Sequence, residues 1–435
     1  MQDQLSFCVV ICVHTDERTE LSVNAIRSVA AQTFKPHEII VVADHNGRLA
    51  DELAKRCPEA RVIANSGPKG LSGARNTGCQ AASSTIIAFL DDDAEADPEW
   101  LSRMATHYAD PSVIGVGGYV EAVWPGGAPS WFPEEFAWVV GCSYRGLPTR
   151  VEAVRNLIGC NMSFQRDKIT LLGGFRETLG REGGNAFGGE ETDICIRATN
   201  VFPGGRIVYD PAILVRHHIS EGRKSLAYFL RRCLAEGRSK AMLVSLNGRQ
   251  DGLSSEQRYL SAILPGGIAA GLGDTLRGRI GGLGRAAAIV AGLLQTAAGY
   301  ADFRFLRSSK AAPADGFQPI SIIDVDLDVP PQWKPLGTTG NGREHGGVFA
   351  LVRRGGRPVA TVELPLIRAV EDTLLFRSLL VAPLCTSRNS RSCASSRRCE
   401  ADQRCRSHPG PAGAACPLPR QPDVPELLEL RDHRR

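Results

Sequence analysis

The first 120 residues alternate between short apolar runs and amphipathic segments, and this alternation limits the fold more than any other feature. Five apolar runs have the length and aliphatic content of buried strands: 5–13, 38–43, 61–64, 85–90 and 112–120. Four segments between them have apolar residues at helical spacing: 20–32, 48–57, 73–82 and 97–109. Strands that alternate with helices predict an α/β fold, with one mainly parallel sheet covered by helices on both faces.

Acidic residues follow two of these predicted strands. Asp91, Asp92 and Asp93 come directly after the fourth run, and Asp44 comes after the second. Adjacent carboxylates repel one another, and withdrawal of solvent raises the cost. Because ligands of parallel sheets bind outside the carboxyl ends of the strands, we expect a cation there, and Asp91 and Asp93 suit Mg²⁺ or Mn²⁺. The alternative is an acidic turn before the next helix, for which one aspartate would be enough.

The stretch "GLSGARNTG" (70–78) is a candidate phosphate site. It places Arg75 and Asn76 in the first turn of a predicted helix, where backbone N–H groups attract anions. The alternative is ordinary helix capping, for which Ser72 is the candidate. The chain has no GxGxxG after its first strand and no GxxxxGK[ST], which argues against a dinucleotide-binding fold and a P-loop.

The stretch "FGGEETDICIRA" (187–198) places Glu190, Glu191 and Asp193 at the start of another predicted helix. A carboxylate in a partly desolvated cleft can remove a proton from a hydroxyl, whereas an acidic first helical turn is the alternative. Further on, "VRHHIS" offers His217 and His218. A single histidine is usually structural, but one that follows an acidic centre is a candidate third metal ligand.

In this order the motifs resemble those of inverting glycosyltransferases of family 2, which have the A-type glycosyltransferase fold, over about residues 5–240. The resemblance rests on the strand ending near "VVICVHT", the aspartate after the second strand, the Ala-Arg-Asn helix, the DxD motif, the acidic helix start and the later histidine. It implies Glu191 as the catalytic base and Asp93 and His217 as metal ligands. It also implies that six residues contact or support the donor: Thr15, Asp44, Arg75, Asn76, Asp91 and Asp92. Asp92 is expected to act mainly as a supporting neighbour of the other two aspartates. The chain departs from the family pattern in having Glu at the base position and Ala43 directly after the second strand.

The resemblance implies a metal-dependent (Mn²⁺ or Mg²⁺), inverting transfer of a sugar from a nucleotide-sugar donor, UDP-sugar favoured, to a hydroxyl of a sugar, lipid-linked or small-molecule acceptor. The aromatic stretch 124–138 could stack on that acceptor or lie on a lipid surface, and the basic run 223–240 could face anionic lipid, so we expect a cytoplasmic protein with peripheral membrane contact. Ordinary packing of both stretches is the alternative.

The formal net charge of +4 does not point to nucleic acid. Two other functions are a nucleotide-sugar-binding pseudoenzyme and a sugar-nucleotide pyrophosphorylase, although the glycine-free loop "CVHTDERTE" lacks the signature loop of the latter.

Beyond the predicted catalytic domain (1–240), we expect a helical, membrane-associating extension (241–306), a small β-rich appendage (307–384) and a disordered tail (385–435). The N-terminal apolar run has strand length and no signal-peptide pattern, and the run 286–301 is shorter than a spanning helix. The eight cysteines of the first 240 residues form no CxxC pair, so we expect reduced, mostly buried thiols.

Overall fold

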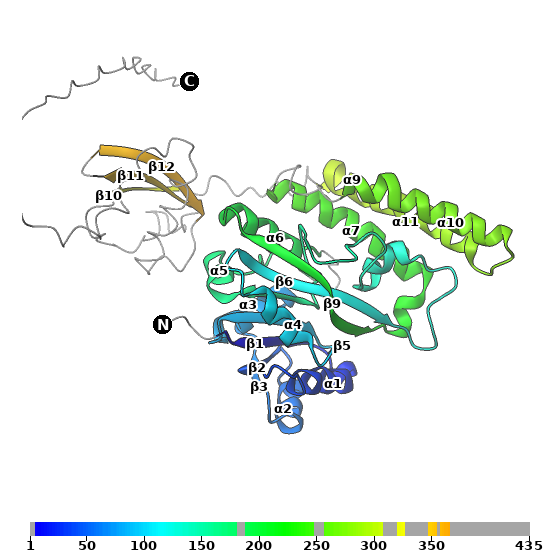
Figure 1. Ribbon diagram of the computed structural model, residues 1–435, viewed down its shortest axis with the longest axis horizontal. Helices are drawn as coiled ribbons and strands as arrows, with labels where there is room; N and C mark the ends of the chain where they lie inside the picture. Colours follow the sequence, from blue (N-terminus) through cyan, green and yellow to red (C-terminus); the bar gives the residue numbers. More distant parts are fainter. Residues whose placement is uncertain are drawn as a thin grey trace, which may run out of the picture. The chain divides into compact units, whose positions relative to one another are not determined.

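The computed structural model describes residues 5–180, 188–247, 256–307, 320–326, 347–354 and 357–365, and its central element is a mixed nine-stranded sheet (Figure 1). The strands pair in the order β3-β2-β1-β4-β8-β6-β9-β5, with β7 paired to β9. The first four strands in this order are parallel: β3 (Arg61–Ala64), β2 (Glu38–Ala43), β1 (Phe7–Val13) and β4 (Ile86–Asp91). Their carboxyl ends therefore meet at one edge of the sheet, which is where the predicted site residues lie.

Both faces of β1, β2 and β4 are buried, which explains why these strands are apolar without alternation. In β1, Phe7, Val9 and Ile11 belong to one core, and Cys8 and Val10 belong to the other. The first core is covered by three helices: α1 (Thr19–Ala30), α2 (Gly47–Arg56) and α4 (Trp100–His107). The second core is covered by three others: α3 (Leu71–Ala81), α5 (Arg166–Leu171) and α6 (Glu190–Val201). The predicted α/β architecture is confirmed.

The other half of the sheet is where antiparallel pairs enter. Its strands are β5 (Ala94–Ala96), β6 (Val113–Val123), β7 (Glu152–Ala153), β8 (Met162–Gln165) and β9 (Arg206–His218). Strand β8 lies antiparallel between β4 and β6, and β9 runs parallel to β6 but antiparallel to β5. The β5–β9 pairing places His217 opposite Ala94, directly beside the acidic turn that follows β4.

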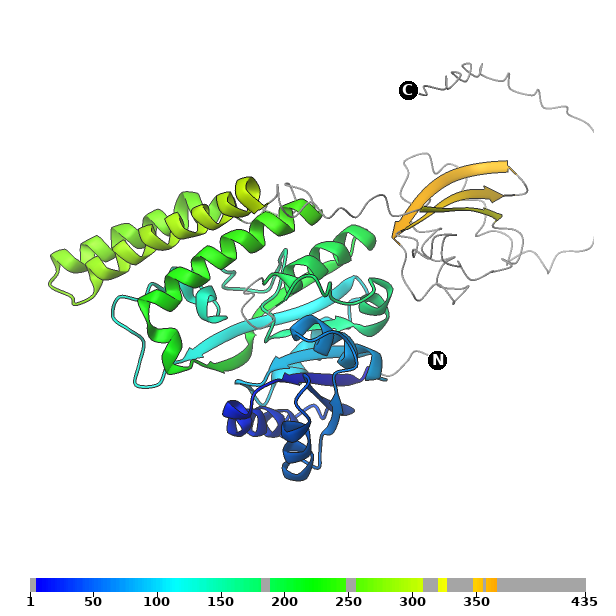
Figure 2. The ribbon, with the colours of Figure 1, turned by 180° about the vertical axis from the view of Figure 1, so that it is seen from behind.

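A layer of long helices follows the sheet (Figures 1 and 2). It consists of α7 (Leu226–Asn247), α9 (Glu256–Arg258), the π-turn η4 (Tyr259–Ile263), α10 (Leu264–Leu276), α11 (Gly282–Ala301) and the π-turn η5 (Asp302–Arg307). Helices α10 and α11 form an antiparallel hairpin, and α11 packs closely on α7. A Cβ atom added to Gly237 of α7 would lie 2.0 Å from the carbonyl oxygen of Thr296, so this contact requires glycine.

One prediction about this layer, the length of the apolar run 286–301, needs correction, and the domain boundary at residue 240 remains a prediction. The boundary expected at residue 240 falls inside α7, so the catalytic domain and the extension share a helix. The run 286–301 belongs to a longer helical segment, Gly282–Arg304, which is long and apolar enough by length and composition to cross a membrane. Within its most apolar window, 28% is buried.

A separate three-stranded sheet contains β10 (Ile320–Asp326), β11 (Gly347–Arg354) and β12 (Arg357–Pro365). These strands fall in the stretch 307–384, where a β-rich appendage is predicted. The predicted disordered tail (385–435) lies outside the described residues. The domain boundaries remain predictions. All eight cysteines of the first 240 residues are free, and six of them are buried.

Candidate active site

Three predicted residues converge on one candidate metal site at the end of β4. One ligand atom from each of Asp91, Asp93 and His217 lies within 4.8 Å of the other two. Asp91 is partly exposed, whereas Asp93 and His217 are buried, and His217 Nε2 is 3.0 Å from Asp93 Oδ1. Two carboxylate oxygens and one imidazole nitrogen suit Mn²⁺ or Mg²⁺, and the exposed Asp91 leaves an open side for water or substrate.

Positive groups surround this acidic centre. Arg18 Nη1 lies 3.0 Å from Asp92 Oδ1 and 3.0 Å from Asp93 Oδ2, and Arg223 lies 3.6 Å from Asp93. Burial opposes the charged form of His217, but its hydrogen bonds to Asp93 and Cys142 outweigh burial and raise the pKa of His217 to about 10. For Asp93, burial is likewise outweighed by His217, Arg18 and Arg223, which lower the pKa of this carboxyl. Arg18, Arg223 and His217 therefore compensate the negative charges of the adjacent aspartates, for which the sequence shows no nearby positive partner.

Asp92 does not join the other two aspartates. It is buried, it accepts a hydrogen bond from Arg18, and its Oδ2 has no hydrogen-bond partner within the described part of the chain. Burial and the adjacent Asp93 raise the pKa of Asp92 to about 7. The structure thus gives Asp92 the supporting role of holding Arg18, and places it outside the group that could bind metal.

Arg75 of α3 links the acidic centre to the start of α6. Its guanidinium is buried, lies 3.0 Å from Glu190 Oε1 and 3.4 Å from Asp91 Oδ1, and donates a hydrogen bond to the carbonyl of Gly159 at 3.1 Å. It also packs over the rings of Phe89 and Phe175. Arg75 therefore fixes the distance between Asp91 and the α6 carboxylates.

Glu191 differs from its neighbour Glu190. Within the described residues no side chain forms a hydrogen bond or ion pair with the Glu191 carboxylate, whereas Glu190 is held by Arg75. Burial, followed by the neighbouring charge of Glu190, raises the pKa of Glu191 to about 8. An unengaged carboxylate with a raised pKa has the properties of a general base that works near neutral pH.

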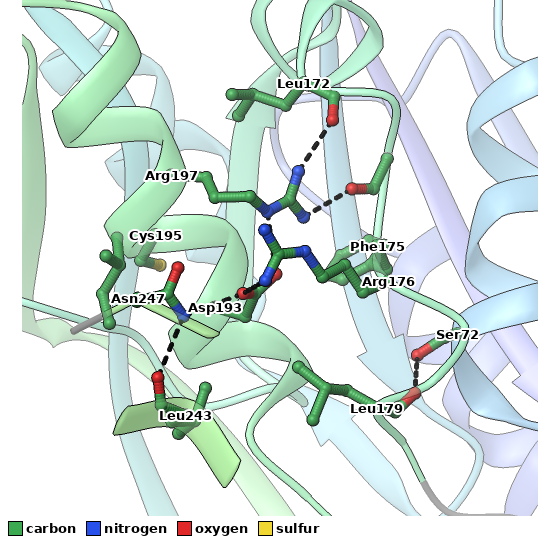
Figure 3. A network of polar contacts seen from close by, with 12 residues as sticks. Ser72, Leu172, Phe175, Arg176, Leu179, Asp193, Cys195, Arg197, Leu243 and Asn247 are labelled. Atoms are coloured by element: carbon green, nitrogen blue, oxygen red, sulfur yellow. Dashed lines mark hydrogen bonds and ion pairs between the residues drawn. The ribbon is translucent and has the colours of Figure 1, made fainter. Parts of the chain in front are cut away.

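The start of α6 is anchored by Asp193, which Figure 3 shows at the centre of a polar network. Its fully buried carboxylate accepts hydrogen bonds from Arg176 (3.0 Å), Arg197 (2.7 Å) and Asn247 (3.0 Å). Arg197 also donates to the carbonyls of Leu172 and Gly174. Asp193 is thus a structural residue that ties α6 to the end of α7.

The prediction of Ser72 as the cap of α3 is wrong, and the donor contact of Asn76 stays a prediction. Asn76, expected to contact the donor, uses both ends of its amide to hold the backbone of Phe175, at 2.9 and 2.8 Å. Ser72, the expected cap, lies inside the helix and donates to the carbonyl of Leu179 at 2.6 Å, while Gly70 takes the N-cap position with φ 122°. Both partners lie about a hundred residues away along the chain, which no local pattern reveals.

Thr15 and Asp44 lie at the ends of β1 and β2, on the same edge as the acidic centre. Thr15 caps the short turn η1 (Asp16–Arg18) by accepting from the N–H of Glu17. Asp44 accepts hydrogen bonds from Asn65 (2.7 Å) and from the N–H of Gly70 (2.9 Å). Asp44 thereby holds the loop that leads into α3.

A cavity of about 480 Å³ joins the catalytic residues to the helical layer. Asp91, Arg75, Glu190 and Glu191 line one part of it. The rest is lined by side chains of η2 (Glu134–Val140), α7, η4 and α11, among them Trp138, Tyr259 and Lys240.

The aromatic stretch packs largely inside the structure, whereas the basic run is partly buried. Trp124, Trp131, Phe132 and Phe136 pack into a cluster with Phe229 of α7, and the Trp138 indole donates to Tyr259. Of the arginines and lysines within α7, Arg231 is exposed and Arg232, Arg238 and Lys240 are partly buried, so contact of this helix with lipid stays a prediction. Two neighbours of the acidic centre were not predicted from the sequence. One is Arg18, which pairs with the aspartates, and the other is Cys142, whose Sγ lies 3.5 Å from Nδ1 of His217.

Comparison with known proteins finds relatives of this chain. A family model described as Glycosyl transferase family 2 matches residues 8–172. The chain is 33% identical over 240 residues to a glucosyl-dolichyl phosphate glucuronosyltransferase of Haloferax volcanii, covering 54% of this chain and 76% of that protein. It is 28% identical over 244 residues to the succinoglycan biosynthesis protein ExoM of Rhizobium meliloti, covering 54% and 74%. Among solved structures, the mannosyltransferase PcManGT of Pyrobaculum calidifontis, in complex with GDP-Man and Mn²⁺, is 16% identical with a TM-score of 0.46, covering 68% of this chain and 88% of that chain.

Proposed function

Because the chain belongs to glycosyltransferase family 2 and has the A-type fold, we propose that it catalyses a metal-dependent, inverting transfer of a sugar from a nucleotide-sugar donor to a hydroxyl acceptor. The observation that carries this proposal is the convergence of Asp91, Asp93 and His217 within 4.8 Å, with Asp91 lining the same cavity as Glu191. UDP-sugars are the favoured donors, and this choice rests on the family resemblance.

We place the nucleotide at the carboxyl ends of β1, β2 and β4. Thr15, Asp44 and Asp91 lie at these three ends, where ligands of parallel sheets bind. Arg75 acts here by fixing Asp91 relative to Glu190. Asp92 acts by holding Arg18 beside the acidic centre.

Asp93 and His217, with Asp91, would hold Mn²⁺ or Mg²⁺. A bound cation supplies Lewis-acid stabilisation of the negative charge that grows on the departing diphosphate. Asp93 is kept ionised by Arg18 and Arg223, so it is ready to act as a ligand, whereas His217 would have to lose its proton to solvent before its imidazole could bind the metal.

Glu191 removes the proton of the acceptor hydroxyl. The oxygen then bonds to the anomeric carbon from the side opposite the diphosphate, the bond from that carbon to the diphosphate oxygen breaks, and the nucleoside diphosphate leaves. One displacement of this kind inverts the anomeric centre. Glu190 is unsuited to the role because Arg75 already holds it.

The acceptor is proposed to be a lipid-linked or cell-envelope glycan intermediate. The relative from Haloferax volcanii is named for a dolichyl phosphate-linked substrate, and the apolar segment Gly282–Arg304 is compatible with membrane contact. Location at the cytoplasmic face of the membrane stays a prediction.

Turnover tests this function. We expect the wild type to release nucleoside diphosphate slowly from its UDP-sugar in the presence of Mn²⁺, and to release none after chelation. Glu191→Gln should bind the donor but not turn over, whereas Glu20→Gln, a change of the same kind at a side chain that is 79% exposed and outside the cavity lining, should keep the reaction. A fully active Glu191→Gln would refute the base assignment, and donor binding without any release by the wild type would indicate a pure binding protein.

A further inference from the structure

The exposed apolar side chains of the described residues gather on the hairpin of α10 and α11 (Figures 1 and 2). Seven of the twelve large apolar side chains that are exposed lie between positions 272 and 294. Leu276 ends α10, Ile280 lies in the turn before α11, and at 90% each they are the most exposed of the twelve. Single exposed leucines are ordinary, but a concentration of this kind marks a binding surface.

The outward face of α11 continues this surface away from the turn. Its exposed residues include Leu283, Ala287, Val290, Leu294 and Ala298, which recur every three or four positions and therefore form one stripe. At the rise of an α-helix the stripe is about 22 Å long. No charged residue occurs between positions 286 and 301, so the stripe favours contact with hydrocarbon over contact with a polar partner.

The charges of the hairpin are confined to the region of its turn. Between positions 264 and 301 the chain has one aspartate, Asp274, and three arginines, Arg277, Arg279 and Arg285. Asp274 lies 2.9 Å from Arg279 and 2.7 Å from Arg285. Three positive charges and one negative charge leave the turn with a formal net charge of +2. A positive turn with two exposed aliphatic side chains matches an anionic membrane, in which headgroup phosphates lie directly above hydrocarbon.

The turn is anchored on its inner side. Arg285 donates a hydrogen bond to the carbonyl oxygen of Ser130 at 3.1 Å, and a Cβ atom added at Gly281, whose φ is 92°, would lie 2.3 Å from the same oxygen. The loop 125–131, which supplies this contact, contains no charged residue and so adds no acidic partner to the turn. The backbone of the turn is thus fixed with Leu276 and Ile280 outside, and docking of these side chains would need little further ordering.

Helix α11 is long and apolar enough to cross a membrane, but its packing favours contact with lipid from one side only. A Cβ atom added at Gly299 would lie 2.0 Å from the carbonyl oxygen of Leu234 in α7, and one added at Gly292 would lie 2.6 Å from the ring of Phe136. Helix α7 contains five charged residues, which are costly to place in hydrocarbon. A helix that is packed this closely on α7 cannot enter the bilayer core without leaving its neighbours.

We propose that the hairpin of α10 and α11 docks the protein on an anionic membrane surface from one side. Leu276 and Ile280 enter the outer part of the hydrocarbon, Arg277 and Arg279 lie at the headgroup phosphates, and α11 stays packed on α7. The proposal narrows the membrane contact expected of residues 241–306 to one turn and gives it a one-sided mode. Binding to vesicles needs neither donor nor metal, so this proposal and the proposed function can fail separately.

Cosedimentation of the full chain with vesicles tests the proposal. We expect the wild type to bind vesicles of phosphatidylcholine and phosphatidylglycerol at least about tenfold more tightly than vesicles of phosphatidylcholine alone. Leu276→Gln combined with Ile280→Gln should weaken binding to the anionic vesicles by at least about tenfold. Val151→Gln combined with Leu226→Gln, at side chains that are 53% and 50% exposed outside the hairpin, should leave it unchanged.

A second pair of variants tests the part played by charge. Arg277→Gln should weaken binding to the anionic vesicles by about fivefold, because one arginine near such a surface contributes about 1 kcal/mol. Arg48→Gln, at an arginine whose side chain is 83% exposed, should not. Washing with about 1 M NaCl, which screens charges beyond about 3 Å, should release most of the bound wild type, and retention would contradict the one-sided mode.

Hydrogen–deuterium exchange then locates the contact. Anionic vesicles should slow exchange in residues 272–285 of the wild type. Protection elsewhere with none at the turn, equal binding to neutral and anionic vesicles, or equal loss in the hairpin variants and their controls would overturn the proposal. A lipid-free dimer that Leu276→Gln with Ile280→Gln dissociates, together with no binding to vesicles, would assign this surface to a second copy of the chain and would overturn it as well.

Discussion

The contact of Arg75 with Glu190 and Asp91 permits a quantitative test of how the site is held together. Arg75 is 2% exposed, and its guanidinium is 3.0 Å from a carboxylate that is itself 4% exposed. The substitution Arg75→Met keeps much of the apolar volume between the rings of Phe89 and Phe175 but removes the charge. It leaves Glu190 as a buried carboxylate without its partner.

The loss of one partner from a buried ion pair costs about 3–5 kcal/mol, because the remaining charge has been withdrawn from water without compensation. That is a large fraction of the ~5–15 kcal/mol of a typical domain. We therefore expect Arg75→Met to lower the free energy of unfolding by about 3 kcal/mol or more, measured by urea denaturation followed by tryptophan fluorescence. Arg48→Met, at an arginine whose side chain is 83% exposed, should change it by less than about 0.5 kcal/mol.

A double-mutant cycle identifies the cause. If the loss of stability comes from the unpaired Glu190 carboxylate, adding Glu190→Gln to Arg75→Met should restore roughly 1–3 kcal/mol of the free energy of unfolding. The reasoning would be refuted if Arg75→Met cost less than about 1 kcal/mol, or if the two substitutions were additive within about 0.5 kcal/mol.

Two further predictions concern the base and the helical layer. The pKa of Glu191 is raised to about 8, and a general base must be ionised to act, so kcat/KM should fall about tenfold per pH unit below pH 8. The measurement is a pH profile of kcat/KM at saturating metal. A flat profile between pH 6 and 8 would contradict the assignment of Glu191 as the base. Gly237→Ala should destabilise the protein by about 1–3 kcal/mol, because the new Cβ would lie 2.0 Å from the carbonyl oxygen of Thr296. Gly222→Ala is the control, because a Cβ atom added at Gly222 would have no heavy atom within 4 Å. Equal melting temperatures for the two variants would contradict the prediction that the contact between α7 and α11 requires glycine at position 237.

The sequence predicts the first half of the fold well because its signals are local. Apolar runs of strand length, separated by helical periods, define β1 to β4 and the helices between them. The acidic centre was also predictable, since Asp91 and Asp93 follow a buried strand. His217 could be proposed, but its approach to Asp93 depends on the β5–β9 pairing, which joins residues more than 120 positions apart.

The contacts that the sequence did not predict are made with partners that are distant in sequence. Asn76 has the same local pattern whether it binds a ligand or the backbone of Phe175. For the basic residues of α7, helical spacing shows which residues share a face but not what covers that face. The long helices of the extension cover that face and form the cavity, so its lining could not be read from the chain.

The central claim is that Asp91, Asp93 and His217 bind a metal that is needed to hold a nucleotide-sugar donor. The most direct measurement is thermal unfolding with a panel of nucleotide sugars, with and without Mn²⁺, for the wild type and for Asp93→Ala. We predict that one UDP-sugar stabilises the wild type only when Mn²⁺ is present, by about 2.7 kcal/mol at a donor concentration one hundred times Kd, and that Asp93→Ala abolishes the effect. Stabilisation that survives chelation or the loss of Asp93, or no stabilisation by any nucleotide sugar, would contradict the claim.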